Sequence, residues 1–175
     1  MQPSRIFTRS TFVLTCSIVL TACTGARPHN LGIVNSTLVP CPESPNCVSS
    51  DSLDVSHYVP AFKLEASSEQ VWSEIKLYVQ SQENMEIVRE LKDYLYVEST
   101  SFFMRFVDDF ELHLREKDGI IAVRSASRYG KSDFGVNKER VDDLYLYLNE
   151  KGLVSEAPMP EHLKLNSADA DTTVE

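Results

Sequence analysis

The sequence lacks the motifs that mark many enzymes and metal-binding proteins. It has no G-x-S-x-G, H-x-x-x-H or C-x-x-C motif and no calcium-loop pattern of acidic residues, and its four histidines are scattered along the chain. Nucleophile-elbow hydrolases, zinc sites and calcium loops depend on such spacings. We therefore expect no catalytic constellation, no metal and no cofactor, and we predict that the protein is not an enzyme.

Basic residues are scarce relative to acidic ones. The 175 residues include 17 Lys and Arg against 26 Asp and Glu, which gives a formal net charge of −9. Residues 1–22 hold two of the basic residues and none of the acidic ones, so the remainder carries 15 minus 26, or −11. Such a charge repels nucleic acid and, by electrostatics alone, anionic membrane surfaces. We expect no nucleic-acid partner.

The apolar stretch TFVLTCSIVLTA, residues 11–22, is much shorter than the about 20 residues that a membrane-spanning helix needs. It follows Arg5 and Arg9, and a basic segment before a short apolar one is typical of a signal peptide. Its last three residues and Cys23 form LTAC, which resembles the lipobox of bacterial lipoproteins. We predict a lipoprotein signal peptide over residues 1–22 and lipidation of Cys23; an ordinary secretory signal is the alternative.

Several acyl chains on Cys23 would attach the protein stably to a membrane. The following residue is Thr24 and not the Asp that is usual in lipoproteins retained at the inner membrane. The expected location is therefore the outer membrane of a bacterial cell envelope, on the periplasmic side. The membrane is the first expected partner, and an envelope protein or a small ligand is the second.

The rest of the chain divides into three parts. Residues 23–39 show no sustained periodicity and are interrupted by Gly, Pro and Asn, which predicts a flexible tether. Residues 40–152 are enough for a single domain with its own core. Residues 153–175 combine prolines, small polar residues and acids, which predicts a disordered acidic tail.

The first predicted helix has a clear start and a clear apolar face. It follows a short strand at residues 59–64, and Ser67 with Gln70 forms a capping pattern. Trp72 is expected in the core, as part of a stripe at helical spacing: Val71, Trp72, Ile75, Tyr78 and Val79. Two strands at residues 85–91 and 94–102 follow, with a turn at Lys92-Asp93.

The segments MRFVDDFELHLRE and GIIAVRSASRY predict a hairpin around Asp118-Gly119, a dipeptide that favours two-residue turns. Such a turn pairs Lys117 with Ile120. Alternation then places on the core face Phe106, Phe110, Leu112, Leu114, Val123, Ser125, Ser127 and Tyr129. On the reverse face, Asp109 is expected directly across from Arg128. Asp108 falls on the apolar face, where a carboxylate needs a partner.

A closing helix is expected after the loop at Gly130 and Gly135, with Asp133 or Asn137 as its cap and Gly152 as its end. The predicted fold is α+β: an antiparallel sheet with two main helices, in the order β-α-β-β-β-β-α. We expect a helix-grip-like arrangement in which the last helix lies across a curved sheet.

Three motifs in this order, CPESPNCVSS, MRFVDDFELHL and VRSASRYGKSDFGVNKERV, resemble the bacterial and plastid family named domain of unknown function 1499. The resemblance runs from about residue 39 to residue 148. It implies motif boundaries and no chemistry, because the family has no assigned reaction, cofactor or mechanism.

The most conspicuous polar segment is RSASRYGKSDFGVN, residues 124–137. It can be a ligand or anion site, because cations and hydroxyls lead into a helix N-terminus. The alternative is structural, with its arginines pairing Asp108 and Asp109. The candidate binding residues are Arg105, Arg124, Ser125, Ser127, Arg128, Lys131, Asp133 and Asn137. We expect a non-catalytic binding module; the alternatives are a hydrolase that uses residues 124–137 and a purely structural interaction module.

Cys41 and Cys47 flank the sequence PESPN. If Cys23 is lipidated and Cys16 leaves with the signal peptide, these two are the remaining cysteines, in an oxidising compartment. Two thiolates do not complete a tetrahedral zinc site, and the redox C-x-x-C spacing is absent. We predict a disulfide between Cys41 and Cys47 that links the tether to the domain.

Overall fold

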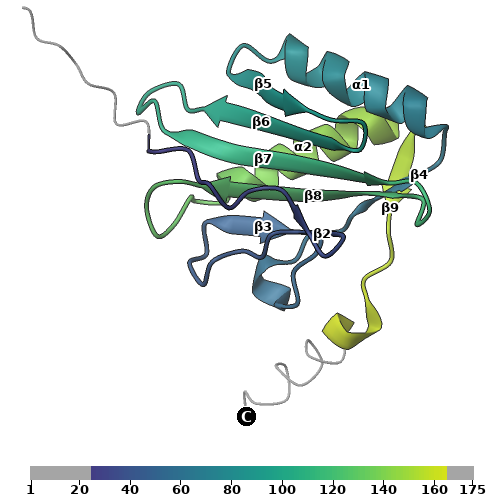
Figure 1. Cartoon of the computed structure of the whole chain (residues 1–175), viewed down its shortest axis with the longest axis horizontal. Helices are drawn as coiled ribbons and strands as arrows, with labels where there is room; N and C mark the ends of the chain where they lie inside the picture. The colour runs from purple at the N-terminus through teal and green to yellow at the C-terminus, as the bar shows by residue number, and fades with distance from the viewer. Residues whose placement is uncertain (1–24, 165–175) are drawn as a thin grey trace, which may run out of the picture.

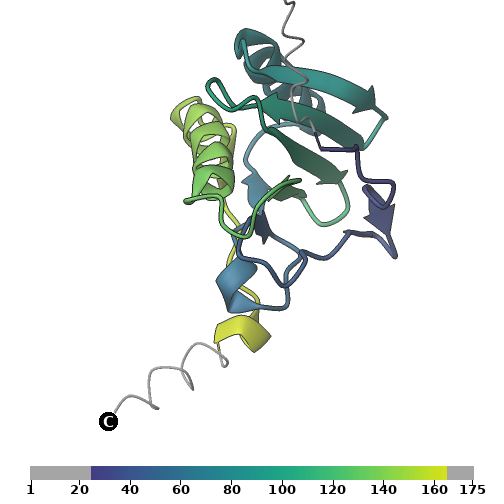
Figure 2. The same cartoon turned by 90° about the vertical axis from the view of Figure 1, so that its left-hand side faces the viewer.

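The computed structural model describes residues 25–164. A seven-stranded antiparallel sheet forms the centre of the described chain, with strand order β5-β6-β7-β8-β4-β9 and β3 paired to β8. Figure 2 shows the helix α2 on one side of the sheet and the first described residues on the other. The sheet is therefore covered on both faces.

The elements follow one another along the chain in an order that contains the predicted one. The strands are β1 (Ile33–Val34), β2 (Thr37–Leu38), β3 (Cys47–Ser49), β4 (Phe62–Leu64), β5 (Met85–Glu90), β6 (Tyr94–Thr100), β7 (Val107–Arg115), β8 (Ile120–Ser127) and β9 (Val154–Glu156). The helices are the 3₁₀ turn η1 (Val55–His57), α1 (Ser68–Ser81) and α2 (Val136–Glu150). The run β4-α1-β5-β6-β7-β8-α2 confirms the α+β fold and its element order.

Helix α1 begins and packs as its sequence predicts. The Ser67 hydroxyl accepts a hydrogen bond from the Gln70 backbone N–H at 3.3 Å. All five residues of the predicted stripe are buried, and Trp72 is 7% exposed. They pack on the core face of the sheet together with the apolar stripe of α2, which contains Val141, Leu144 and Leu148. Side chains therefore fill the space between the sheet and both helices.

Helix α2 ends at Glu150, two residues before Gly152, the glycine predicted to end it. Gly152 has φ +68°, a left-handed conformation that glycine adopts without steric cost. The N–H groups of Gly152 and Leu153 bind the carbonyls of Asn149 and Leu148, at 2.8 and 3.1 Å. This pattern satisfies carbonyls in the last turn of the helix.

The β7–β8 hairpin has the predicted faces but a different register. Arg115, not Lys117, pairs with Ile120, so the loop has four residues and Asp109 lies opposite Ala126. The N–H groups of Asp118 and Gly119 close this turn by binding the carbonyls of Arg115 and Glu116. The predicted two-residue turn is therefore wrong. A shift of two residues preserves the alternation, so each side chain within β7 and β8 stays on its predicted face.

The expected tether and the expected tail both extend the fold. Residues 25–39 form the β1–β2 hairpin on the reverse face of the sheet, where Leu38 is buried against Tyr94, Tyr96 and Ala122. At the other end, β9 pairs with β4, and Leu153, Val154 and Leu163 are buried. The segment 25–39 is thus not a free linker, and the domain continues past residue 152. The predicted signal peptide and Cys23 lie outside the described residues, as do positions 165–175.

Candidate functional site

The polar residues predicted to form one site lie on two faces of the sheet and in two loops. Ser125 and Ser127 face α2, as predicted, whereas Arg124 and Arg128 face the N-terminal segment. Arg105 and Lys131 are exposed, in the loops after β6 and β8. The eight predicted residues therefore do not surround one ligand position.

On the helix side, the hydroxyls and the amide form a buried polar cluster. Asn137 is fully buried, and its amide nitrogen donates to the carbonyl of Asn46 and to the Ser127 hydroxyl, both at 2.9 Å. Its amide oxygen accepts hydrogen bonds from Ser125 and from Arg140, both at 2.7 Å. The donors and the oxygen of this amide are thus engaged within the protein.

Asp108 has the partner that its position on the apolar face requires. Its carboxylate binds the guanidinium of Arg140 at 2.7 Å, and both side chains are about one-tenth exposed or less. Arg140 comes from the second turn of α2 and was not among the predicted site residues. Its position three residues after Asn137, on the same helical face, is the sequence signal that would have suggested it.

On the reverse face, Arg128 holds several groups together. Its guanidinium binds Asp109 at 2.7 Å, Glu98 at 2.5 Å and the Tyr96 hydroxyl at 2.7 Å. Burial alone would lower the pKa of Arg128, but the hydrogen bonds to Asp109 and Glu98 raise it, so the side chain is charged. The predicted contact between Asp109 and Arg128 is confirmed, although it is diagonal and not directly across the strands.

Arg124 forms a second buried ion pair on this face. Its Nη1 binds Glu111 at 2.9 Å, and the side chains are 7% and 0% exposed. The other carboxylate oxygen of Glu111 accepts the N–H of Gly32 at 2.7 Å and the Tyr94 hydroxyl at 2.7 Å. These contacts hold the N-terminal segment on the sheet.

The N-terminus of α2 already carries a carboxylate. Asp133 accepts the backbone N–H groups of Gly135 at 3.1 Å and Asn137 at 2.9 Å. Partial burial alone would raise the pKa of Asp133, but these backbone hydrogen bonds lower it. The N-cap residue is Gly135 and not Asp133 or Asn137 as predicted. The Asp133 carboxylate nevertheless binds the N–H groups at the start of the helix, where an external anion would bind.

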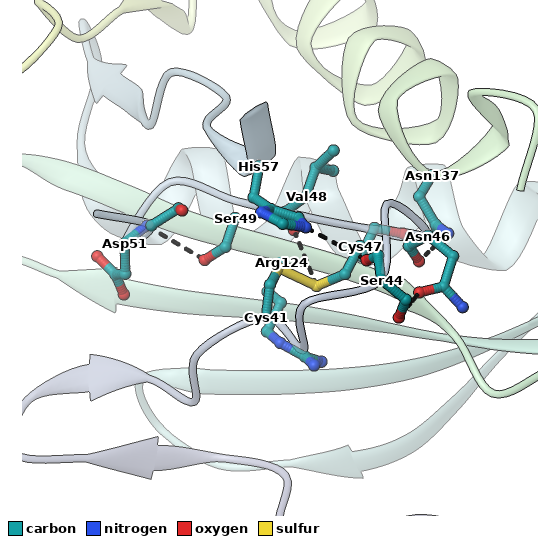
Figure 3. The surroundings of a disulfide bond; sticks show 12 residues. Cys41, Ser44, Asn46, Cys47, Val48, Ser49, Asp51, His57, Arg124 and Asn137 are labelled. Carbon is teal, nitrogen blue, oxygen red and sulfur yellow. Dashed lines mark hydrogen bonds between the residues drawn. A yellow bond between two sulfur atoms is a disulfide. The ribbon is translucent and has the colours of Figure 1, made fainter. Parts of the chain in front are cut away.

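Cys41 and Cys47 form a disulfide, as predicted, with Cα atoms 5.7 Å apart. Figure 3 shows it beside Arg124, with Asn46 next to Asn137 of α2. Cys47 is the first residue of β3, which pairs with β8. The disulfide therefore joins the N-terminal segment to the sheet.

A different surface has the character of a binding site. A pocket of about 430 Å³ lies between the loop 101–106 and the segment 129–136. Both loops lie at the end of the sheet where the described chain begins (Figure 1). We call its exposed apolar residues the apolar tip: Phe102, Phe103, Met104, Phe106, Tyr129, Phe134 and Val136.

The side chains of the apolar tip are unusually exposed. Phe102, Phe103 and Phe134 are 83%, 89% and 96% accessible to solvent. Phe106 and Tyr129 stack on each other at 6.3 Å between ring centroids, with planes 4° apart. Both were predicted in the core, but they lie beyond the ends of β7 and β8, where they are not covered by the helices.

Both loops also hold a non-glycine residue in the left-handed conformation. The φ angles are +56° at Arg105 and +55° at Phe134. The left-handed conformation costs free energy in residues other than glycine, and such residues are found preferentially at functional sites. Arg105 and Lys131 flank the apolar tip, and within residues 25–164 neither side chain has a hydrogen bond or an ion pair.

The described chain offers little for metal or triad chemistry. No group of three or more His, Cys, Asp or Glu residues in positions 25–164 is arranged to hold a metal ion. Ser56 Oγ lies 3.3 Å from His57 Nδ1, but Asp54 approaches that same nitrogen at 3.2 Å. A triad histidine uses one nitrogen for each partner, and His57 Nε2 instead faces the Ser44 carbonyl at 3.2 Å.

Comparison with known proteins gives a family and nothing finer. Residues 37–148, more than half of the chain, match the model of a family described as Protein of unknown function (DUF1499). No curated protein and no solved structure matches the chain. The matched range includes the disulfide, the hairpin and the apolar tip.

Proposed function

Because the chain belongs to the DUF1499 family, whose function is unknown, we propose its role from its own geometry: a lipid-anchored, non-catalytic binding module of the bacterial envelope. The anchor in this proposal is Cys23, at the periplasmic side of the outer membrane. The binding site is the apolar tip, and the ligand is apolar, of the acyl-chain type.

The observation that carries this proposal is the exposed apolar surface around the tip pocket. Monomeric proteins rarely expose large contiguous apolar patches, and those that do use them for binding. The pocket volume of about 430 Å³ falls within the range of ligand sites. Three phenylalanines that are more than four-fifths exposed bury little apolar surface in the fold described here, so a role in binding accounts for them.

The alternatives have less support. A hydrolase would need an accessible nucleophile, whereas Ser125 is fully buried and Ser127 binds Asn137. A purely structural role fits the ion pairs of Arg124, Arg128 and Arg140. It does not explain why the side chains of the apolar tip are exposed.

A fluorescent fatty acid tests the proposal on the mature protein. Phe103→Ser and Phe134→Gly each remove a nearly fully exposed side chain, and glycine suits the positive φ at position 134. Each variant should weaken binding about tenfold or more, because burying a phenylalanine contributes about 1.5–3 kcal/mol. The control is Leu53→Ser, since Leu53 is 76% exposed and does not line the pocket. Binding that all three variants retain would contradict the proposal, as would ester turnover lost in Ser127→Ala.

A further inference from the structure

We propose that the apolar tip docks into the same lipid leaflet that holds the acyl chains of Cys23. This inference rests on the proposed function and names the source of its ligand, a membrane surface. Three observations carry it: the position of Gly25 next to the tip, the contacts that hold the segment from Gly25 to Cys41 on the sheet, and the side chains that surround the tip.

Gly25 lies beside the apolar tip. The carbonyl oxygen of Gly25 accepts a hydrogen bond from Arg128 Nη1 at 3.3 Å. A Cβ atom at Gly25 would lie 3.2 Å from the Tyr129 ring, which belongs to the tip. Cys23 precedes Gly25 by two residues, which span at most about 7 Å. Acyl chains on Cys23 would therefore enter the bilayer at most about 10 Å from the Tyr129 ring of the apolar tip.

The segment from Gly25 to Cys41 is held against the sheet, so an anchor two residues before Gly25 would stay near the apolar tip. Arg27 binds Glu98 at 2.6 Å, and the Gly32 N–H binds Glu111 at 2.7 Å. The disulfide at Cys41 fixes the end of the same segment. A long free tether would allow any face to meet the membrane, whereas this attachment presents one end of the sheet.

The chemistry of the tip suits a lipid interface. Phenylalanine and methionine side chains enter the acyl region, and cationic side chains beside them meet lipid phosphates. Arg105 and Lys131 lie in the two tip loops, and the residues directly before and after each of them line the pocket. The acidic charge elsewhere in the mature chain disfavours contact of other faces with anionic lipid.

A membrane explains these features better than the other occupants. A second copy of the chain or an envelope protein would also cover apolar side chains, but neither accounts for the position of Gly25 next to Tyr129. The anchor makes a lipid surface the partner of highest local concentration, because its binding is intramolecular.

The test uses the mature lipoprotein reconstituted in vesicles of phosphatidylethanolamine and phosphatidylglycerol. Phe103→Trp and Phe134→Trp place an indole at the tip, and Leu53→Trp is the matched control in another exposed loop. The native Trp72 is buried and common to all variants. With brominated acyl chains, the two tip variants should lose most of the added fluorescence, and the control should keep it.

A second test measures how much the two cations beside the tip contribute to docking. Arg105→Gln and Lys131→Gln should each lower the docking constant of the tip about fivefold in these vesicles, read from the quenching of Phe103→Trp. Equal quenching in tip and control positions, or none in either, would overturn the inference. So would a tip protected only in a dimer found by cross-linking. If quenching is absent while the fatty acid still binds, docking fails and the proposed function stands; if neither occurs, both fail.

Discussion

Arg128 donates a hydrogen bond to the carbonyl oxygen of Gly25, a residue 103 positions earlier in the chain. The same guanidinium binds Asp109 and Glu98 in the sheet. A single side chain therefore joins the first described residue to the end of β8, where the apolar tip begins. This contact helps to hold Gly25 beside the apolar tip.

The first prediction concerns Arg128. Arg128→Gln should free the N-terminal segment and leave the buried carboxylate of Asp109 uncompensated, at a cost of about 3–5 kcal/mol in the free energy of unfolding. The Val39 N–H donates to the Gly32 carbonyl, and the Gly32 N–H donates to Glu111. Hydrogen exchange at these two amides should accelerate more than exchange in α1. An unchanged exchange pattern would show that the segment is held by other contacts.

The second prediction concerns the pair Asp108–Arg140. Each single alanine variant should lower the free energy of unfolding by about 3–5 kcal/mol, because it leaves a buried charge without a partner. The double variant should lose less than the sum, as a double-mutant cycle in denaturant will measure. Lys138→Ala is the control on the same helix; its exposed pair with Asp142 should contribute about 0.5 kcal/mol or less. Strict additivity would contradict the account of a coupled buried pair.

The sequence predicted well what depends on local periodicity. The face of α1, the faces of β7 and β8, and the need of Asp108 for a partner all follow from alternation or helical spacing. Every second residue of a strand and every third or fourth residue of a helix lies on the same side, so the spacing of apolar residues predicts which side is buried.

The sequence did not predict what depends on contacts distant in the chain. Residues 25–39 show no sustained periodicity, yet they cover the sheet because Leu38 and Gly32 meet Tyr94, Tyr96 and Glu111 far along the chain. The apolar tip was missed because Phe106 and Tyr129 continue the strand alternation. Only their position beyond the strand ends leaves them exposed. Three consecutive apolar residues, Phe102 to Met104, cannot all face a core from one strand and were the available signal.

The third prediction concerns pH. Hydrogen bonding from Arg27, with further help from Arg128, lowers the pKa of Glu98 from 4.5 to about 2. Because the pKa of Glu98 is lower in the folded than in the unfolded state, its ionisation stabilises the fold at pH values above the unfolded-state pKa. That contribution is lost as the pH falls from 4.5 towards 2. Glu98→Gln should therefore flatten the fall in unfolding free energy across this range. Glu150→Gln, an exposed change at the end of α2, is the control. A slope that Glu98→Gln leaves unaltered would refute the assignment.

The fourth prediction concerns the disulfide. The mature protein, unfolded without reduction, should titrate with no free thiol, because Cys41 and Cys47 are bonded to each other and Cys23 would carry lipid under the proposed function. The double variant Cys41→Ser with Cys47→Ser should lose about 2 kcal/mol, the value for closing so short a loop. Its N-terminal segment should also exchange amide hydrogens faster. Two titratable thiols in the native protein would contradict the pairing.

The most direct test of the central claim, that the apolar tip binds lipid, is photocross-linking in intact cell envelopes. Phospholipids that carry a photoreactive group in an acyl chain are activated by light, and the modified peptides are identified by mass spectrometry. We predict that cross-links fall in residues 101–106 and 129–136, and that they decrease in Phe103→Ser but not in Leu53→Ser. Cross-links spread evenly over the protein, or absent from both segments, would contradict the account.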